Sequence, residues 1–236
     1  MSTVAYITAR GLFGRRRALM LLPLPLLLIG LAAICRAYDL EPTQWGAAVV
    51  VGLGFAVMLP VIALIIGTGV LGSEIDDGTL VHILTKPLPR RDIILAKFVV
   101  AVVATAVTTS VPLFVAGLLA GSAKFGFALA AAAVVGAFAY TALFLLLSLV
   151  TRRPVLLGLV YILIWEGLLG RWVSGTRVLS IEQYVISIAA KIEPSTILDP
   201  KVGIATAVVM SAVFVVLCTV VAINRLGSFS LAGETS

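Results

Sequence analysis

Six long apolar runs dominate the sequence and constrain its fold more than any other feature. A helix that crosses a bilayer needs about 20 apolar residues, each adding about 1.5 Å. The runs are residues 18–35, 46–71, 98–120, 125–149, 155–169 and 202–223. Since 61% of the residues are hydrophobic and only 12% are charged, the composition excludes a soluble domain. We therefore predict an all-α integral membrane protein with six transmembrane helices, forming a single membrane domain over residues 1–236.

The basic residues predict the orientation of these spans. Loops between spans alternate between the two sides of the membrane, and the cytosolic side carries more Lys and Arg. One side would hold Arg10, Arg15, Arg16, Arg17, Lys86, Arg90, Arg91, Lys97, Arg152, Arg153 and Arg225. The other side would hold Arg36, Lys124, Arg171, Arg177, Lys191 and Lys201. We therefore predict that both termini are cytosolic. We attribute the net charge of +6 to basic residues that anchor the spans at the membrane surface, and we therefore expect no nucleic-acid partner.

Two further segments are predicted to lie at the membrane surfaces. Residues 1–17 mix apolar and basic side chains and would form an inner interfacial segment. Residues 170–201 would form an outer one. Apolar side chains of this second segment share a helical face: Val178, Ile181, Val185, Ile188, Ala189 and Ile192. Polar side chains occupy another face: Ser180, Gln183, Ser187 and Lys191. The pattern predicts an amphipathic helix between the last two spans, either lying on the outer interface or re-entering the outer leaflet.

Polar side chains within the apolar runs are few. Glu166 is the only charged residue there, and it can be interpreted as a hydrated interfacial residue, as a partner of Arg171, or as a polar lip on an exit path. Thr105, Thr108 and Thr109 form a hydroxyl cluster. Together with Glu166 they are our candidates for a substrate path, although such hydroxyls more often bond within or between helices.

Catalytic and cofactor signatures are missing from the sequence. His82 stands alone, and no metal-binding spacing of histidines or cysteines occurs. The chain also lacks the Gly-x-x-x-x-Gly-Lys-Ser/Thr loop that cradles the phosphates of ATP. We predict that the protein is not an enzyme and has no catalytic residues, no metal site and no cofactor of its own.

The segment between the second and third runs is the most polar part of the chain. Residues 73–92 contain seven charged residues and the single histidine within twenty positions. Asp76 could cap a short helix from Asp77 to Thr85, which the Lys86–Pro87 step would end, and Asp92 could cap the next span. Leu80, Ile83 and Leu84 would then form a small apolar face. This predicts a helix that docks on a cytosolic partner; the alternative is a solvated loop whose charges only set topology.

The same segment resembles a signature of the membrane subunits of type-2 ATP-binding-cassette exporters. That signature runs from a glutamate through Gly-Thr-Leu, an apolar pair, a proline and arginines to a lysine. The matching residues here are Glu74, Gly78, Thr79, Leu80, Ile83, Leu84, Pro87, Arg90, Arg91 and Lys97. The six-span layout and the interfacial segment before the last span match as well. The resemblance implies a coupling helix over residues 74–91, and we include Asp77 among its candidate contacts.

What the resemblance implies reaches beyond this chain. It implies two copies of a cytosolic ATP-binding-cassette ATPase, which bind ATP and Mg²⁺, and a second permease subunit that is either an identical copy or a sister chain. It also implies export, and the charge-poor spans suggest an amphiphilic or hydrophobic cargo. We expect the protein to cross a bacterial inner membrane several times and to contact membrane lipid there. The alternative is a membrane anchor or regulatory subunit of a partner complex without transport.

Overall fold

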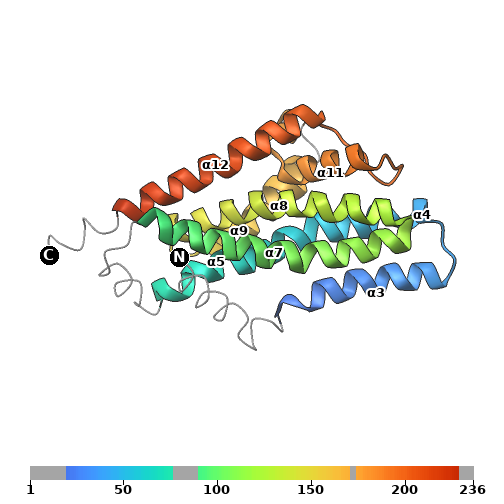
Figure 1. Ribbon diagram of the computed structural model, residues 1–236, viewed down its shortest axis with the longest axis horizontal. Coiled ribbons are helices and arrows are strands. Elements are labelled where there is room, and N and C mark those ends of the chain that lie inside the picture. The colour runs from blue at the N-terminus through green and yellow to red at the C-terminus, as the bar shows by residue number, and fades with distance from the viewer. Residues whose placement is uncertain (1–19, 77–89, 171–173, 229–236) are drawn as a thin grey trace.

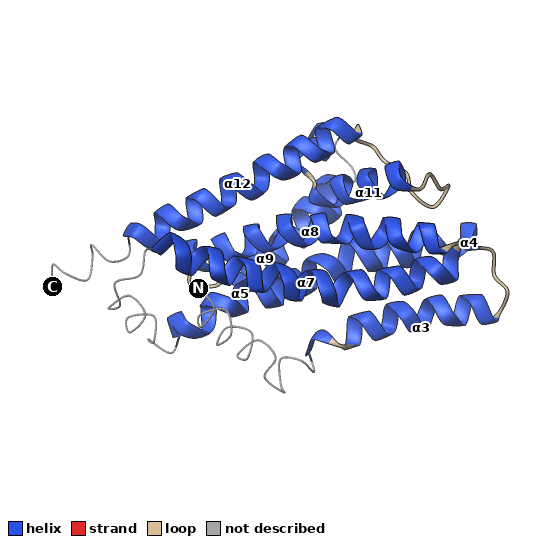
Figure 2. Ribbon diagram, in the orientation of Figure 1, coloured by secondary structure: helices blue, strands red, loops and turns tan. Residues whose placement is uncertain are grey.

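The structure is a bundle of long apolar helices lying side by side. The computed structural model describes residues 20–76, 90–170 and 174–228 (Figure 1). All regular secondary structure in these ranges is helical, as Figure 2 shows. The prediction of an all-α chain is therefore confirmed over the residues described.

The helices follow one another with short connections. In chain order they are α3 (Pro23–Ala37), α4 (Pro42–Gly46), η1 (Ala47–Met58), α5 (Leu59–Asp76), α7 (Arg90–Ala120), α8 (Ala123–Val150), α9 (Pro154–Val160), η2 (Tyr161–Leu169), η3 (Ser174–Leu179), α11 (Ile181–Ile192) and α12 (Ile204–Ser228). Prolines start α3, α4 and α9, where a missing N–H costs nothing. Ser122 caps α8 by accepting a hydrogen bond from the Phe125 N–H at 3.1 Å.

Four helical runs of the described chain are long and apolar enough to cross a membrane. They are Pro42–Val70, Ile94–Ala120, Ala123–Val150 and Ile204–Arg225, which correspond to the predicted spans at 46–71, 98–120, 125–149 and 202–223. The predicted spans at 18–35 and 155–169 are also helical and apolar. As Pro23–Ala37 and Pro154–Leu169, however, they are shorter than a full crossing. Full-length spans are thus confirmed at four of the six predicted positions.

Two of these runs contain π-helices, which no periodicity in the sequence predicted. η1 joins α4 to α5 in one continuous helical run, and η2 continues α9. A π-helix bonds each N–H five residues back instead of four, and most examples are single turns near functional sites. η2 is the element that carries Glu166.

Helix α8 is the centre of the bundle. It packs against α7, α5, α12 and α11. At the crossing with α7, a Cβ added to Gly117 would lie 2.5 Å from the Gly126 Cα, so only glycine allows this approach. Small residues at such crossings let two helix backbones pack closely inside a membrane.

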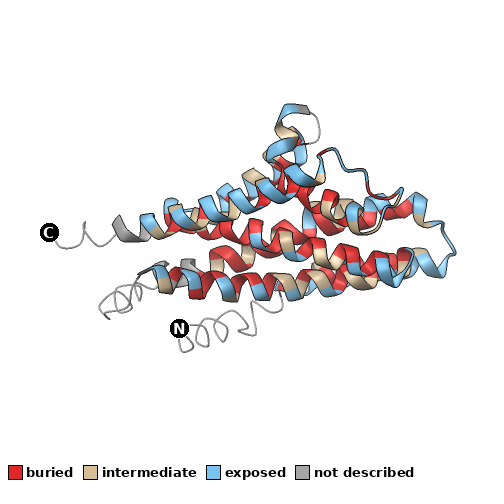
Figure 3. Ribbon diagram, turned by 45° about the horizontal axis from the view of Figure 1, so that its top comes forward, coloured by how far each residue is buried: buried red, intermediate tan, exposed pale blue. Residues whose placement is uncertain are grey.

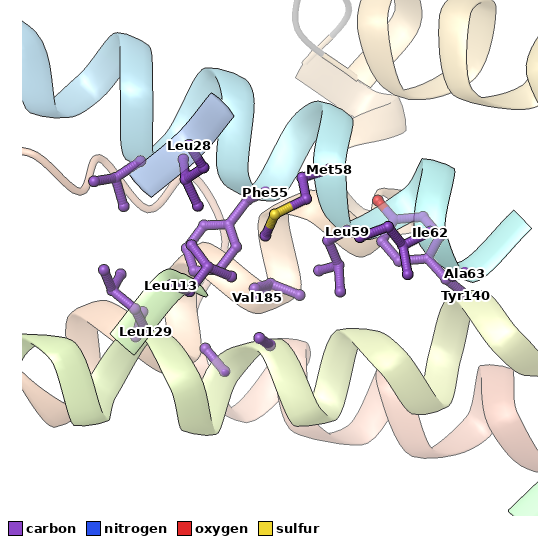
Figure 4. Packing of buried hydrophobic residues seen from close by; sticks show 14 of the residues in the cluster. Leu28, Phe55, Met58, Leu59, Ile62, Ala63, Leu113, Leu129, Tyr140 and Val185 are labelled. Carbon is purple, nitrogen blue, oxygen red and sulfur yellow. The ribbon is translucent and has the colours of Figure 1, made fainter. Parts of the chain in front are cut away.

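The core and the surface are both apolar, which distinguishes this bundle from a soluble one. Figure 4 shows the interior, where Phe55, Met58, Leu59 and Tyr140 pack together without solvent exposure. Exposed residues follow the outer faces of the helices (Figure 3). On α7 these include valines four residues apart, more than half exposed: Val99, Val103, Val107 and Val111. An outer surface this apolar suits contact with hydrocarbon.

The predicted amphipathic helix forms as α11, but its surroundings differ from the interfacial prediction. Ile181, Val185 and Ala189 are buried, as expected of the apolar face. Gln183 and Ser187 on the polar face are buried too, because α11 packs against both α8 and α12. α11 is therefore covered by other helices on its polar face as well as on its apolar face, and its position on the outer interface or within the outer leaflet stays a prediction.

The helices beside the 77–89 segment are longer than predicted. α5 extends to Asp76, and the short helix that this residue was predicted to cap, from Asp77 to Thr85, lies outside the described residues. α7 begins at Arg90, eight residues before the predicted span, and Asp92 lies in its first turn instead of capping it. An acidic residue in the first turn still favours the helix, because it faces the positive end of the helix dipole.

Candidate functional site

The predicted coupling region lies between the ends of α5 and α7. Most of its candidate residues fall outside the described residues: Asp77, Gly78, Thr79, Leu80, Ile83, Leu84 and Pro87. The backbone of Glu74 belongs to the last turns of α5, and Arg90 is the first residue of α7. α5 ends with Ser73, Glu74 and Asp76 among its last residues, and α7 begins with Arg90, Arg91 and Asp92, so both helices carry charged residues at the ends that lead into this segment.

Lys97 joins these two helices. Its side chain is fully buried, and its Nζ donates a hydrogen bond to the Val70 carbonyl oxygen at 3.0 Å. Val70 lies near the end of α5 and Lys97 near the start of α7, so the contact bridges the two ends that carry the 77–89 segment. A charged donor makes this bond stronger than a neutral one. Arg91, by contrast, is exposed and lies 3.7 Å from Asp92, a surface pair that adds little stability.

The threonine cluster of α7 is satisfied within the bundle. The Thr109 hydroxyl donates to the Thr105 carbonyl at 2.8 Å, and that of Thr108 to the Ala104 carbonyl at 2.7 Å. Across the helix interface, the Thr141 hydroxyl donates to Thr105 Oγ1 at 3.4 Å. Thr105 and Thr109 are buried, whereas Thr108 is half-buried. These bonds fit the alternative that the hydroxyls serve helix packing, and the substrate path through them stays a prediction.

Thr108 alone of the three lines a lateral groove. The groove has a volume of about 370 Å³ and lies between the start of α3 and the middle of α7. Apart from Thr108, its walls are apolar: Leu21, Leu22, Pro25, Val107, Val111 and Pro112.

Glu166 is the acceptor at the centre of a buried polar cluster. Only 2% of the residue is exposed, so it is not the hydrated interfacial residue that the sequence suggested. Its Oε1 accepts from the Tyr140 hydroxyl at 3.2 Å and the Tyr161 hydroxyl at 3.0 Å. At the start of α11, the Ile181 N–H donates to Oε1 at 2.9 Å and the Ser180 hydroxyl to Oε2 at 2.5 Å. The carboxylate therefore joins η2, α8 and the N-terminus of α11, whose dipole favours an acidic group.

More polar contacts hold α11 to the chain before α12. The Gln183 Oε1 accepts from the Lys201 N–H at 3.3 Å, and the Ser187 hydroxyl donates to the Val202 carbonyl at 2.8 Å. Tyr184 donates its hydroxyl to the Val178 carbonyl. Burial, and after it the nearby Glu166 carboxylate, raise the pKa of Tyr184 to about 12, which keeps this donor protonated.

Sequence reasoning missed most of this network. One signal was available: Ser180 and Gln183 have the spacing of a capping box, and the Ser180 Oγ does accept from the Gln183 N–H at 3.3 Å. Tyr140 and Tyr161 gave no signal, because a tyrosine within an apolar run does not reveal its hydrogen-bond partner: Tyr140 lies in α8, 26 residues from Glu166, and Tyr161 lies in η2 itself, 5 residues away. Arg171, the proposed ion-pair partner, lies outside the described residues.

Within the described part of the chain, no three His, Cys, Asp or Glu side chains gather closely enough to hold an ion. Both cysteines there, Cys35 and Cys218, are free.

The chain matches a known family of membrane proteins. The family model described as ABC-2 family transporter protein matches residues 16–170, which is more than half of the chain. The matched range includes the 77–89 segment, Lys97 and Glu166, and it ends before α11. No curated protein matches the chain.

Proposed function

Because the chain belongs to the ABC-2 family of transporter proteins, we propose that it is the permease subunit of an ATP-binding-cassette exporter. In this role it spans the membrane six times with both termini in the cytosol, and it pairs with a second permease subunit. Two separate ATPase subunits bind ATP and Mg²⁺ beneath the pair. The permease forms the path for an amphiphilic or hydrophobic cargo moved outward. Membership of a transport family also indicates a permease rather than an enzyme.

The observation that carries the proposal is the joint between α5 and α7. Both helices carry charged residues at the ends that lead into the 77–89 segment, and the buried bond from Lys97 to Val70 ties them together near those ends. A partner that moves this segment would therefore move two spanning helices together. α5 and α7 both pack on the central helix α8, so such a movement would reach the middle of the bundle.

The short apolar helices suit a bundle that changes shape. α3 and the α9–η2 run are shorter than a full crossing, and they lie against α7 and α8 respectively. A short helix leaves part of its neighbour exposed, as the α3–α7 groove illustrates. Such an opening supports lateral access for an apolar cargo from the bilayer.

Charge reversal in the coupling region tests the proposal. The full-length tagged chain is purified in mild detergent with its partners, either unaltered or carrying Glu74→Lys and Arg90→Glu. We expect a cytosolic ATPase to co-purify with the unaltered chain, and the double variant to lose it and the cargo-stimulated ATP hydrolysis. Arg152→Glu is the matched control, because this exposed residue between α8 and α9 lies outside the 74–91 region.

The anchor or regulatory alternative predicts a different result. A co-purifying partner without ATPase activity would contradict the permease role. So would an ATPase that binds and turns over equally well with the reversed charges.

A further inference from the structure

A second pocket lies at the opposite end of the bundle from the 77–89 segment. It has a volume of about 350 Å³ and opens between the start of η1, helix α11 and the chain that leads into α12. This size is at the lower end of the range for pockets that hold small organic ligands. None of the predicted site residues lines it.

The pocket combines an apolar wall with a charged mouth. Ala47, Val51 and Gly52 of η1 face Ile186 of α11 and Ile197 across it. Ala47 lies five residues into the apolar helical run Pro42–Val70, so this wall belongs to one end of a candidate membrane span. A ligand bound there would have its apolar part along η1 and its polar part at the mouth.

The mouth offers one positive and one negative group. Asp199 and Lys201 form an ion pair there, with side chains 75% and 43% exposed. An exposed pair of this kind contributes little to stability, so exchanging its partners for those of a ligand costs little. Glu182 lies deeper on the same wall, is 3% exposed, and also has an interaction within the chain.

The pocket is built before any ligand arrives. Glu166 holds the start of α11 through Ser180 and Ile181, which places Glu182 and Ile186 on the wall. The Gln183 side chain holds the backbone of Lys201. A preformed site loses less conformational entropy on binding than a mobile one.

We propose that this pocket binds an amphiphile with a zwitterionic head, whose ammonium pairs with Asp199 and whose anionic group pairs with Lys201. The apolar part lies along Ala47, Val51 and Gly52. The inference deepens the proposed export function, on which it rests, by naming the class of amphiphile. Phospholipids with an ethanolamine head and zwitterionic cargo share this chemistry.

Photo-crosslinking of the full-length chain in nanodiscs tests the site without any ATPase. The probe is phosphatidylethanolamine with a diazirine in its acyl chain, and labelled peptides are identified by mass spectrometry. We expect labelling within residues 47–52 and 182–201. Lys201→Glu should lower it roughly tenfold, the effect of losing one strong charged contact. Equal labelling by a phosphatidylglycerol probe, which lacks the ammonium, would overturn the proposal.

Two further variants separate binding from folding. Asp199→Lys with Lys201→Asp exchanges the charges but keeps the pair, so labelling should return to within about twofold of the unaltered chain. Gly52→Leu fills the pocket, and its Cβ would meet only the Ala47 carbonyl oxygen at 3.7 Å, so the helix tolerates it. Labelling of Gly52→Leu at the level of the unaltered chain would overturn the proposal. So would loss of labelling in the charge-exchanged variant, if that variant unfolds at the same temperature as the unaltered chain.

A final competition experiment shows whether the ligand is a transported cargo or a membrane lipid. In the assembled complex, a soluble zwitterionic alkyl amphiphile that competes with the probe and raises ATP hydrolysis identifies the pocket as a cargo site. Competition without a change in hydrolysis identifies it as a lipid site. Since binding is measured on the chain alone, a failed coupling experiment contradicts the export function without affecting this result.

Discussion

The two ends of the bundle are held together in different ways. At the α11 end, Glu166 accepts from four donors on three elements, and Gln183 and Ser187 add further bonds. At the end that carries the 77–89 segment, a buried lysine joins α5 to α7. The comparison suggests a division of work, in which the α11 end preserves shape and the other end passes movement from a partner into the bundle.

Removing Glu166 should have the largest effect. Glu166→Ala leaves three buried donors and the half-buried Tyr161 hydroxyl without their acceptor, and each buried group left unsatisfied costs about 1–3 kcal/mol. Because water can enter the space, we expect a total loss of roughly 3–5 kcal/mol in the free energy of unfolding. Thermal unfolding of the detergent-purified chain measures it. Glu41→Ala is the control, since Glu41 is exposed, and equal unfolding temperatures would contradict a structural role for the cluster.

Removing Lys97 should affect coupling more than stability. Lys97→Met keeps much of the side-chain volume and leaves the Val70 carbonyl without this donor, at a cost of about 1.5–3 kcal/mol. We expect cargo-stimulated ATP hydrolysis to fall by more than this loss of folded protein explains. Hydrolysis by the assembled complex is measured beside Arg91→Met, which changes an exposed neighbour. If Lys97→Met leaves cargo-stimulated ATP hydrolysis unchanged, the bond between Lys97 and Val70 has no role in coupling.

The crossing of α7 and α8, which connects the two ends, should tolerate no added bulk. Gly117→Ala would bring a Cβ to 2.5 Å from the Gly126 Cα, and overpacking of this kind costs about 1–3 kcal/mol. Gly121→Ala is the matched control, because its Cβ would meet nothing closer than 3.9 Å. Chemical denaturation of both variants in mixed micelles compares them, and equal stabilities would show that the helices can move apart there without cost.

The smallest effect is expected from a single hydroxyl at the α11 end. The Ser187 hydroxyl lies 2.8 Å from both the Val202 carbonyl and the Gln183 carbonyl within α11, so Ser187→Ala removes one donor that two acceptors share and should cost about 1 kcal/mol. Ser211→Ala removes only a bond within α12, to the Val208 carbonyl, and should be nearly neutral. If both variants unfold alike, the tie between α11 and the start of α12 contributes nothing measurable.

Much of the candidate site could not be predicted from the sequence, and the reason differs by region. At the 77–89 end, the predicted signature included Lys97, but nothing in the sequence predicted its bond to Val70, which lies 27 residues away. At the α11 end, the amphipathic pattern over residues 178–192 predicted a helix, and α11 forms over Ile181–Ile192. Its burial between α8 and α12 could not be predicted, because a polar face looks the same in a sequence whether water or buried partners satisfy it.

By itself, the sequence determined that this chain is helical and lies in a membrane, and where most of its spans begin and end. It could do so because a bilayer offers no hydrogen bonds, so each apolar segment must satisfy its own backbone as a helix. Only the tertiary structure decided which polar groups meet. Glu166 looked like an isolated interfacial charge until α8, η2 and α11 brought four donors to it. Those contacts depend on how helices pack, and packing distances leave no local pattern in a sequence.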